Sequence, residues 1–350
     1  MTRIREATRD DNDGLLSLTA MTPMGGDISI KTDRSPDFFR LLDRRGPSHV
    51  LVAEEGGKIV GSVSVTRVPV YVDEKRESVH YLGDLKVHPD HRKAGLAVGL
   101  LKAMHRDLLA DGADLVLSTA AYGNEKVLPF FDGRAGLPRA VPIGVFRVYQ
   151  LLPSRRRRDA DPYTVREEPE HPEMLRLYNN HFRQYQFGPV CEPGALGNAR
   201  NWVARTHGEI QASLSLVDVR DARQNVIVRL PFFLGRLVSI LRAVRRIVPV
   251  ADLPAINTPI RMLYIKAMAC REGHEEALGH LIQEARIAAF KGHSHFLAVG
   301  LHETDPVGLR LAKFFKFTFK SMGFVVGLKR GNDELVQLKR RIPYEDYSLV

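Results

Sequence analysis

The hydrophobic and polar positions of the first 150 residues follow the pattern of a mixed α/β domain. Alternation over residues 3–7 predicts a strand, and the acidic run from Asp10 to Asp13, ahead of a leucine-rich stretch, predicts the start of a helix. A second short helix is predicted to begin at Ser35. Valine-rich runs predict three strands, over 50–53, 59–68 and 79–87, of which the first two are joined by a hairpin turn.

Helical and buried-strand patterns then follow one another up to residue 151. Leucines and a methionine recur on one face of 95–110, which predicts an amphipathic helix that Gly112 ends. The next predicted elements are a buried strand over 115–119, a helix over 124–131 and a closing strand over 143–151. The predicted fold class is therefore α/β, built on a mixed sheet.

The order of elements repeats in the second part of the chain. The repeat predicts strands over 163–167, 259–269 and 296–300, and helices over 172–182, 275–290 and 306–319. Arg92 follows Arg3 by 89 positions, whereas Arg271 follows Tyr163 by 108. The difference is about the length of an apolar and basic segment that occurs only in the second copy, so a tandem duplication with one insertion explains the spacing.

The repeat also sets the expected domain organisation. We expect one domain over 1–152, a linker over 153–162 that contains a run of four arginines, and a second domain over 163–350 with a helical insertion at 231–250. The insertion is too interrupted by charge to span a membrane. Packing against the sheet is the favoured interpretation, ahead of a lid over an acyl chain or a contact with a membrane surface.

Composition and charge narrow the class of protein. Hydrophobic residues make up 44% of the chain and charged residues 26%, as in a packed globular protein. Most of the net charge of +10 lies in residues 151–350, but aromatic residues do not interleave with the arginines, so a nucleic-acid partner is not favoured. The N-terminus lacks the apolar segment of a secretory signal, and a cytoplasmic location is expected. The pattern does not predict an oligomeric state.

The sequence gives little support for a metal site or a disulfide bond. Two cysteines, Cys191 and Cys270, are too few for a disulfide framework or a cysteine-based zinc site. His293 and His295 share a predicted strand face, yet no partner carboxylate is evident. We therefore expect no metal.

The loop that follows the 79–87 strand has the composition of a phosphate-binding helix start. Free backbone amides at the N-terminus of a helix bind a pyrophosphate, and the helix dipole favours the negative charge. Gly95 and Ala97 leave room for a close approach, while Arg92 and Lys93 add positive charge. The loop follows a strand and opens a helix, as this chemistry requires.

These residues carry a family resemblance. The segment Leu85-Lys86-Val87-His88-Pro89-Asp90-His91-Arg92-Lys93-Ala94-Gly95-Leu96-Ala97 resembles the acetyl-CoA signature of the GNAT N-acetyltransferase superfamily, and Asn124 with the following Phe130-Phe131 and Ala135-Gly136-Leu137 resembles its later motif. The resemblance spans 1–152 and implies acetyl-CoA as co-substrate. It implies that Leu85, Lys86 and Val87 contact pantetheine through their backbone, that Arg92, Lys93, Ala94, Gly95, Leu96 and Ala97 bind the pyrophosphate, and that Asn124 lies near the pantetheine or the sulfur.

Transfer to an amine requires proton transfers, since an amine is mostly protonated at neutral pH. Asp84 lies on the strand beside the expected thioester and is the candidate base, directly or through water, with His80 and Tyr81 as second choices. The resemblance implies a tyrosine acid on the helix after the asparagine, but Phe131 stands at that position. Tyr122 or water could protonate the leaving thiolate instead.

The second copy differs at the corresponding loop, 270–276. This loop lacks the small-residue spacing and carries three acids that would repel phosphates, so we expect the second copy to shape the acceptor pocket and not to bind coenzyme A. The predicted function is acetyl transfer to the amine of a small molecule or peptide. The alternatives are a longer-chain acyl-CoA N-acyltransferase, suggested by the apolar insertion, and a non-catalytic coenzyme A binding or regulatory module, suggested by Phe131.

Overall fold

The computed structural model describes residues 2–22, 29–92, 95–124, 128–155, 162–229, 236 and 254–350. The first half of the chain contains strands β1 (Arg3–Glu6), β2 (Ser29–Asp33), β3 (Ser48–Glu55), β4 (Lys58–Val72), β5 (Lys75–Val87), β6 (Leu115–Ala121) and β7 (Val141–Leu151). Its α-helices are α1 (Asn12–Met21), α2 (Arg40–Arg45), α3 (Leu96–Ala110) and α4 (Leu128–Phe131). Short 3-10 helices occupy Arg9–Asp11, Pro89–His91 and Arg134–Gly136.

The second half repeats this order with some additions. Its strands are β8 (Thr164–Glu168), β9 (Gly188–Pro189), β10 (Arg200–Thr206), β11 (Glu209–Asp218), β12 (Gln224–Arg229), β13 (Pro259–Ile260), β14 (Met262–Cys270), β15 (Phe296–His302) and β16 (Lys316–Gly327). Its helices are α5 (Pro172–Phe182), α7 (Glu275–Lys291), α8 (Val307–Arg310), α9 (Asn332–Gln337) and a 3-10 turn at Leu338–Arg340.

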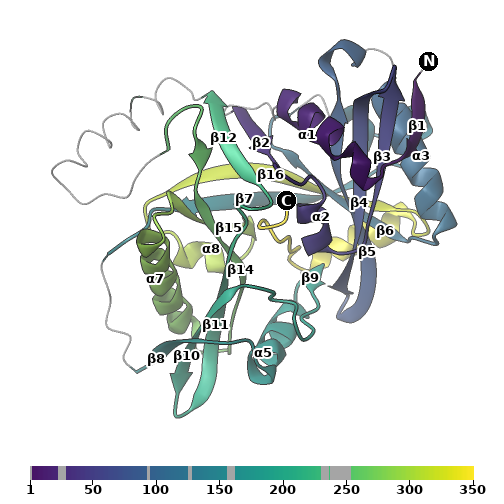
Figure 1. Ribbon diagram of the computed structural model, residues 1–350. Coiled ribbons are helices and arrows are strands. Elements are labelled where there is room, and N and C mark those ends of the chain that lie inside the picture. Colours follow the sequence, from purple (N-terminus) through teal and green to yellow (C-terminus); the bar gives the residue numbers. More distant parts are fainter. Residues whose placement is uncertain are drawn as a thin grey trace.

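One 13-stranded sheet runs through the whole molecule. Its order is β1-β3-β4-β5-β6-β16-β7-β15-β14-β11-β10-β8, with β9 attached to β4. Figure 1 shows β7 and β16 crossing between the two halves, so each half donates its last strand to the other. Strands at the same distance from the two ends of the sheet are equivalent in the two halves: β1 corresponds to β8, β5 to β14 and β16 to β7. The sheet is therefore pseudo-symmetric, which confirms the tandem arrangement predicted from the spacing.

Local registers repeat along with the strand order. The β3–β4 hairpin shifts its register between Ala53 and Glu54, and the β10–β11 hairpin shifts between Ala204 and Arg205. Each shift marks a β-bulge, a backbone irregularity that is conserved within protein families. The two halves thus share details that a common strand order alone would not produce.

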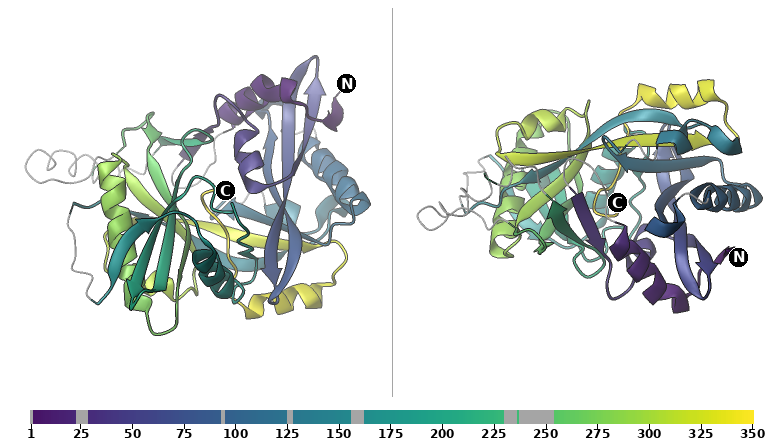
Figure 2. Two further views of the ribbon diagram at one scale, coloured as in Figure 1. Left: turned by 60° about the horizontal axis from the view of Figure 1, so that its bottom comes forward. Right: turned by 90° about the horizontal axis from the view of Figure 1, so that it is seen from above.

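Alternating strand residues place helices on both faces of the sheet. Leu51 and Ala53 of β3 pack in a cluster with α3, whereas Val50 and Val52 pack in a cluster with α1 and the segment that leads into α2. Helices α7 and α5 take the corresponding places in the second half, on clusters formed with β10, β11 and β14. Figure 2 shows α3 and α7 at opposite outer ends of the molecule.

A small second sheet connects the halves. Its order is β13-β12-β2, and β2 of the first half pairs antiparallel with β12 of the second. At one end of the β2–β12 pairing, the last paired residues are Asp33 and Gln224. Residues immediately beyond this pair, Arg34 and Arg223, are both buried.

Several predicted elements are corrected. The helix predicted over 306–319 is wrong, since α8 ends at Arg310 and β16 begins at Lys316. Phe315, Phe317 and Phe319 alternate with polar residues, a period of two that fits a strand, and pairing with β7 stabilises it. The second helix begins at Arg40 and not at Ser35. Residues 156–161 of the predicted linker and all of the predicted 231–250 insertion except Arg236 lie outside the described residues.

No helix in the described part of the chain is both long enough and apolar enough to cross a bilayer. The same part contains no group of three His, Cys, Asp or Glu side chains arranged to hold a metal ion. Cys191 and Cys270 are free thiols.

Candidate active site

The parallel strands β5 and β6 separate shortly after they meet. They pair only at His80 with Val116 and at Tyr81 with Leu117. The rest of β5, including Leu85, Lys86 and Val87, therefore has no β6 residue beside it. Unpaired backbone groups along a strand edge can pair with an extended ligand. This opening is what the predicted pantetheine contacts of these three residues require.

The N-terminus of α3 lies just beyond the opening. Gly95 is its N-cap, with a left-handed φ of 68°, and a Cβ added there would meet no atom within 4 Å. No side chain caps this end, and the first turn holds no acid. The amides of Leu96 and Ala97 in that turn are therefore suited to bind an anion. Arg92 is exposed nearby, while Lys93 and Ala94 lie outside the described residues.

A cavity of about 1160 Å³ opens on the separated strands. Residues from both halves line it, and they include Leu85 and Lys86 of β5, Tyr122 and Asn124 after β6, and Lys320 of β16. The sequence predictions from β5 and from the segment after β6 thus meet in one place. The backbone amide of Asn124 donates to the carbonyl of Ala121 at 3.1 Å, which ends β6 in a turn.

Asp84 lies in the wall of this cavity at a β-bulge. Its φ is 50°, and the β4–β5 register shifts beside it between Ser62 and Ser64. Ser62 Oγ donates to the Asp84 carbonyl at 2.9 Å, and Ser64 Oγ donates to Asp84 Oδ2 at 2.9 Å. Arg34 Nη1 donates to the same Oδ2 at 2.8 Å. The bulge and three side chains therefore fix the position of the carboxylate.

Electrostatics at this point stabilise the charged form of Asp84 and destabilise the charged form of Lys86. Burial acts against the charge of Asp84, but Arg34, Lys86 and the hydrogen bonds keep the pKa of Asp84 below its ordinary value. Burial lowers the pKa of Lys86 from its ordinary value, with Arg34 acting in the same direction and Asp84 opposing it. Lys86 was predicted as a backbone contact, and its side chain is a candidate base that the sequence pattern did not reveal.

The second-choice bases differ in their surroundings. Tyr81 lines the cavity, and its hydroxyl forms a hydrogen bond with Thr119 Oγ1 at 2.7 Å beneath the Arg45 guanidinium. Burial raises the pKa of Tyr81 to about 12, so it stays protonated at neutral pH. Burial lowers the pKa of His80, which is not among the residues that line the cavity.

The two aromatic residues near the expected leaving group have different environments. Tyr122 lines the cavity and is 54% exposed. Phe131, which stands where the resemblance implies a tyrosine, stacks on Phe324 of β16 with ring centroids 3.9 Å apart. The side chain at position 131 is thus part of an apolar contact between the halves.

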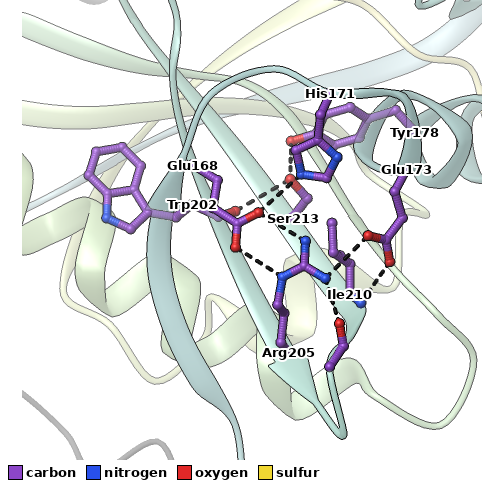
Figure 3. Close-up of polar contacts among 9 residues, drawn as sticks. Glu168, His171, Glu173, Tyr178, Trp202, Arg205, Ile210 and Ser213 are labelled. Atoms are coloured by element: carbon purple, nitrogen blue, oxygen red, sulfur yellow. Dashed lines mark hydrogen bonds and ion pairs between the residues drawn. The ribbon is translucent and has the colours of Figure 1, made fainter.

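The equivalent region of the second half is filled by its own side chains. Ser213 and Ser215 match Ser62 and Ser64 in the repeated register, but their hydroxyls hydrogen-bond with the Tyr178 hydroxyl at 2.9 and 2.8 Å. Figure 3 shows the contact of Tyr178 with Ser213. Tyr178 is fully buried, and burial raises its pKa well above the ordinary value. Strands β14 and β15 also separate, since they pair only over Met262–Tyr264 and Phe296–Ala298, but a buried tyrosine holds the matching serines.

The start of α7 is occupied in a similar way. Gly273 has a left-handed φ of 81°, as Gly95 does at α3, but its amide donates to Glu275 Oε1 at 3.1 Å. Glu275 and Glu276 also place two carboxylates in the first turn of α7. An anion would be repelled there, in keeping with the expectation from the sequence.

Comparisons with known proteins match the N-terminal part of this chain to a family. Residues 3–124 match the acetyltransferase (GNAT) domain family. The chain therefore carries a GNAT acetyltransferase domain in its N-terminal half. An acetyltransferase of Pectobacterium atrosepticum is 33% identical over 106 residues, which cover 30% of this chain and 62% of that protein. One of Sodalis glossinidius is 30% identical over 106 residues, 30% of this chain and 61% of that protein. The match spans slightly less than two thirds of these relatives.

Solved structures extend the likeness to nearly the whole chain. N-myristoyltransferase of Saccharomyces cerevisiae, crystallised with bound myristoyl-CoA, superposes with a TM-score of 0.63 at 13% identity, covering 93% of this chain and 82% of that chain. A GCN5-related N-acetyltransferase from Anabaena variabilis gives a TM-score of 0.55 at 10% identity, covering 92% and 72%. At these identities the comparison establishes a shared fold over nearly the whole chain.

Proposed function

We propose that this protein is an acyl-CoA-dependent N-acyltransferase that transfers an acetyl group from acetyl-CoA to an amine. The observation that carries the proposal is the separation of β5 and β6, which opens on the cavity, together with the uncapped N-terminus of α3 that follows β5 in the chain. Gly95 to Ala97 would hold the pyrophosphate, and Leu85 to Val87 would pair with the pantetheine arm. Arg92, Lys93 and Ala94 would complete the loop, and Asn124 would lie near the sulfur.

The acceptor would approach from the face of the sheet opposite α3. Gly61 of β4 lies beneath Leu96 and Leu100 of α3, so the alternation of the strand directs Ser62 and Ser64 to the other face, where they meet Asp84. The amine nitrogen would form a bond to the thioester carbonyl carbon as the carbon–sulfur bond breaks. An ammonium must lose two protons: a base takes the first, which frees the nitrogen lone pair for attack, and the second leaves the nitrogen to a base or water as the amide forms. The departing thiolate takes one proton from Tyr122 or water.

Two groups compete for the role of base. Asp84 is charged over the whole neutral range because its pKa is lowered, so it can hold an ammonium but is a weak proton acceptor. Lys86 has a lowered pKa and can accept a proton when it is neutral. We propose that Asp84 holds the ammonium, as a direct or water-mediated partner, and that Lys86 is the alternative proton acceptor.

A longer-chain acyl donor is the second candidate. Apolar residues of α3, β6 and β16 line one part of the cavity, among them Leu101, Leu108, Val116, Val326 and Leu328. Such a lining offers space for a hydrocarbon chain longer than acetyl. With either donor, we propose that the second half forms a wall of the acceptor pocket. The linker between the two domains would be residues 153–162.

A thiol-release assay tests the proposal. Acyl-CoA donors of two to sixteen carbons are combined with a panel of amines, polyamines, amino acids and short peptides, and coenzyme A affinity is measured by calorimetry. Release with acetyl-CoA and at least one amine supports acetyl transfer, and a maximum at a longer chain supports the second candidate. Tight coenzyme A binding without release for any pair would favour a non-catalytic module.

A further inference from the structure

Arg34 is a buried cation with unused hydrogen-bonding capacity beside the candidate base. It lies just after β2, lines the cavity and is 3% exposed. Nη1 donates to Asp84, and the guanidinium lies over the Phe38 ring at 4.2 Å. Nε and Nη2 are shielded from solvent, and no described residue accepts a hydrogen bond from either. Unpaired buried donors of a charged group are costly, so a ligand that accepts from them would stabilise the site.

The two unpaired nitrogens form one edge of the guanidinium. This is the edge with which an arginine binds both oxygens of a carboxylate. The same chain uses it twice, since Arg200 binds the two oxygens of Glu167 through Nε and Nη2 at 2.9 and 2.7 Å. Arg205 binds Glu168 in the same manner, as Figure 3 shows. Arg34 presents this edge without a carboxylate.

A second buried arginine lines the same cavity. Asp33 and Gln224 are the last partners in the β2–β12 register, and Arg34 and Arg223 are the next residues on the two chain segments. Arg223 lines the cavity, is 8% exposed and donates through Nη2 to Tyr264 Oη and the Tyr347 carbonyl. Its Nε has no acceptor, and no carboxylate among the described residues pairs with it. The two halves of the chain thus contribute one arginine each.

The charges that line the cavity also favour an anion. Among the described lining residues, Asp84 has the single acidic side chain, against the guanidinium groups of Arg34, Arg45 and Arg223, the ammonium of Lys320, and Lys86, whose pKa is lowered. Arg45 is paired with Glu345, which lies outside the lining, at 3.5 Å. On Asp84, the hydrogen bonds from Arg34 and Ser64 both go to Oδ2, and no described residue donates to Oδ1. The site therefore offers a free carboxylate oxygen for a cation next to a free guanidinium edge for an anion.

We propose that the acceptor carries a carboxylate beside its amine, as an amino acid does, with the carboxylate on Arg34 and Arg223 and the ammonium on Asp84. The inference rests on the proposed N-acyltransferase function and names its acceptor class. The amine then enters on the side of Asp84, next to the separated strands where the thioester would lie. Neutral amines and amides fill only half of this arrangement.

Matched acceptors test the proposal in the full-length protein. Glycine, leucine, phenylalanine and lysine are each compared with their primary amides, which keep the amine and remove the carboxylate charge. For the preferred pair we expect kcat/KM to be about 10- to 100-fold higher for the acid, the range expected for charged hydrogen bonds. Equal rates for acids and amides throughout would overturn the proposal while leaving the N-acyltransferase function intact.

Variants assign the preference to the arginine edge. Arg34→Lys keeps a cation beside Asp84 but removes the two-donor edge, and the double variant Arg34→Gln with Asp84→Asn removes both charges together. Each should bring the acid-to-amide ratio close to one, mainly through KM. Arg9→Gln is the matched control, because Arg9 also lies over a phenylalanine, Phe39, and pairs with an aspartate, but it is 62% exposed and does not line the cavity. A ratio that survives Arg34→Lys would contradict the assignment.

A binding measurement separates failure of this inference from failure of the proposed function. Calorimetric titration of the same acids and amides into the protein with coenzyme A requires no turnover. Binding of an acid but not its amide, lost in Arg34→Lys and kept in Arg9→Gln, would support the carboxylate site even if no acyl transfer occurs. Absence of both binding and rate preference would overturn it.

Discussion

The two halves of this chain share a backbone plan but treat equivalent positions in opposite ways. Both place a left-handed glycine before the helix that follows the separated strand, Gly95 before α3 and Gly273 before α7. In the first half no side chain occupies the helix N-terminus, whereas in the second Glu275 accepts from the Gly273 amide. A helix start is an anion site only while its amides are free. The side chains, and not the fold, therefore separate a binding copy from a structural one.

The matching serine pairs teach the same lesson. Ser62 and Ser64 hold a charged aspartate on the wall of a cavity, while Ser213 and Ser215 hold the hydroxyl of a buried tyrosine. One pair positions a group for chemistry, and the other satisfies a large core side chain. Duplication thus left one half open to a ligand and allowed the other to fill its core.

The largest expected effect on coenzyme A binding comes from glycine substitutions at the two helix starts. Gly95→Val should weaken coenzyme A binding by about 10- to 100-fold, because the side chain would occupy the space of the phosphates. Gly273→Val is the matched control. It imposes a similar backbone strain, and a Cβ there also meets no atom within 4 Å. Calorimetry with coenzyme A measures both variants. Equal losses would show that strain, and not the phosphate site, determines the result.

Substitution of the two candidate bases, Lys86 and Asp84, should change the kinetics of transfer and not the affinity for coenzyme A. If Lys86 accepts the proton, the rate of the wild type rises with pH as Lys86 loses its charge, at a pH below the ordinary lysine value because its pKa is lowered. Lys86→Met should then lower kcat by about 10²-fold or more and remove this rise. Asp84→Asn should mainly raise KM for the amine.

The pH profiles of both variants decide between the two roles. Asp84 is already charged above its lowered pKa, so its titration cannot produce a change in rate near pH 7. A neutral-range rise that persists in Lys86→Met and disappears in Asp84→Asn would contradict the role of Lys86. Coenzyme A affinity should remain unchanged in both variants, which serves as the control for folding.

Sequence reasoning succeeded where a local pattern determines the structure. The alternating runs, the glycine hairpin and the amphipathic 95–110 stretch each specify their element from neighbouring residues, and the structure confirms them. The repeat spacing predicted the duplication. The segment 306–319 failed because the aromatic residues from Phe315 onward form a strand that depends on pairing with β7, a partner more than 160 positions away.

The site was predicted only in part for the same reason. Gly95 and Asp84 stand in or beside a recognisable motif, so their positions could be found from the sequence. Arg34 and Arg223 could not, since they come from different halves of the chain and line one cavity through tertiary structure that no local pattern encodes. The lowered pKa of Lys86 likewise follows from burial by distant segments.

A smaller effect on stability should distinguish the two serine pairs. Tyr178→Phe removes the shared partner of Ser213 and Ser215 in the core, and we expect the free energy of unfolding to fall by about 2 to 3 kcal/mol with little change in kcat. Ser62→Ala with Ser64→Ala should do the reverse, lowering activity more than stability, because Asp84 keeps Arg34. Chemical denaturation and the thiol-release assay measure both variants. If Tyr178→Phe lost activity while it remained fully folded, the proposed functional difference between the two halves would be wrong.

The pH dependence of stability offers the finest contrast, because two glutamates have pKa values shifted in opposite directions. Burial raises the pKa of Glu345, which faces Arg45 of the first half, to about 7. The folded protein then binds a proton that the unfolded chain releases at lower pH, so this residue makes the protein less stable as pH rises from about 4.5 to 7. The hydrogen bond from Arg205 lowers the pKa of Glu168, so its contribution is present at neutral pH and is lost as pH falls.

Glutamine substitutions at these two positions should therefore change the stability profile with opposite sign. Between pH 5 and pH 7, Glu345→Gln should gain about 1 to 2 kcal/mol relative to the wild type, since the glutamine does not need to ionise. Glu168→Gln should lose stability at neutral pH and approach the wild type below pH 4, where the wild-type carboxyl is also neutral. Urea denaturation at several pH values measures both. If the two variants gave parallel profiles of stability against pH, Glu345 and Glu168 would respond to protonation in the same way. The electrostatic difference between their two regions would then be wrong.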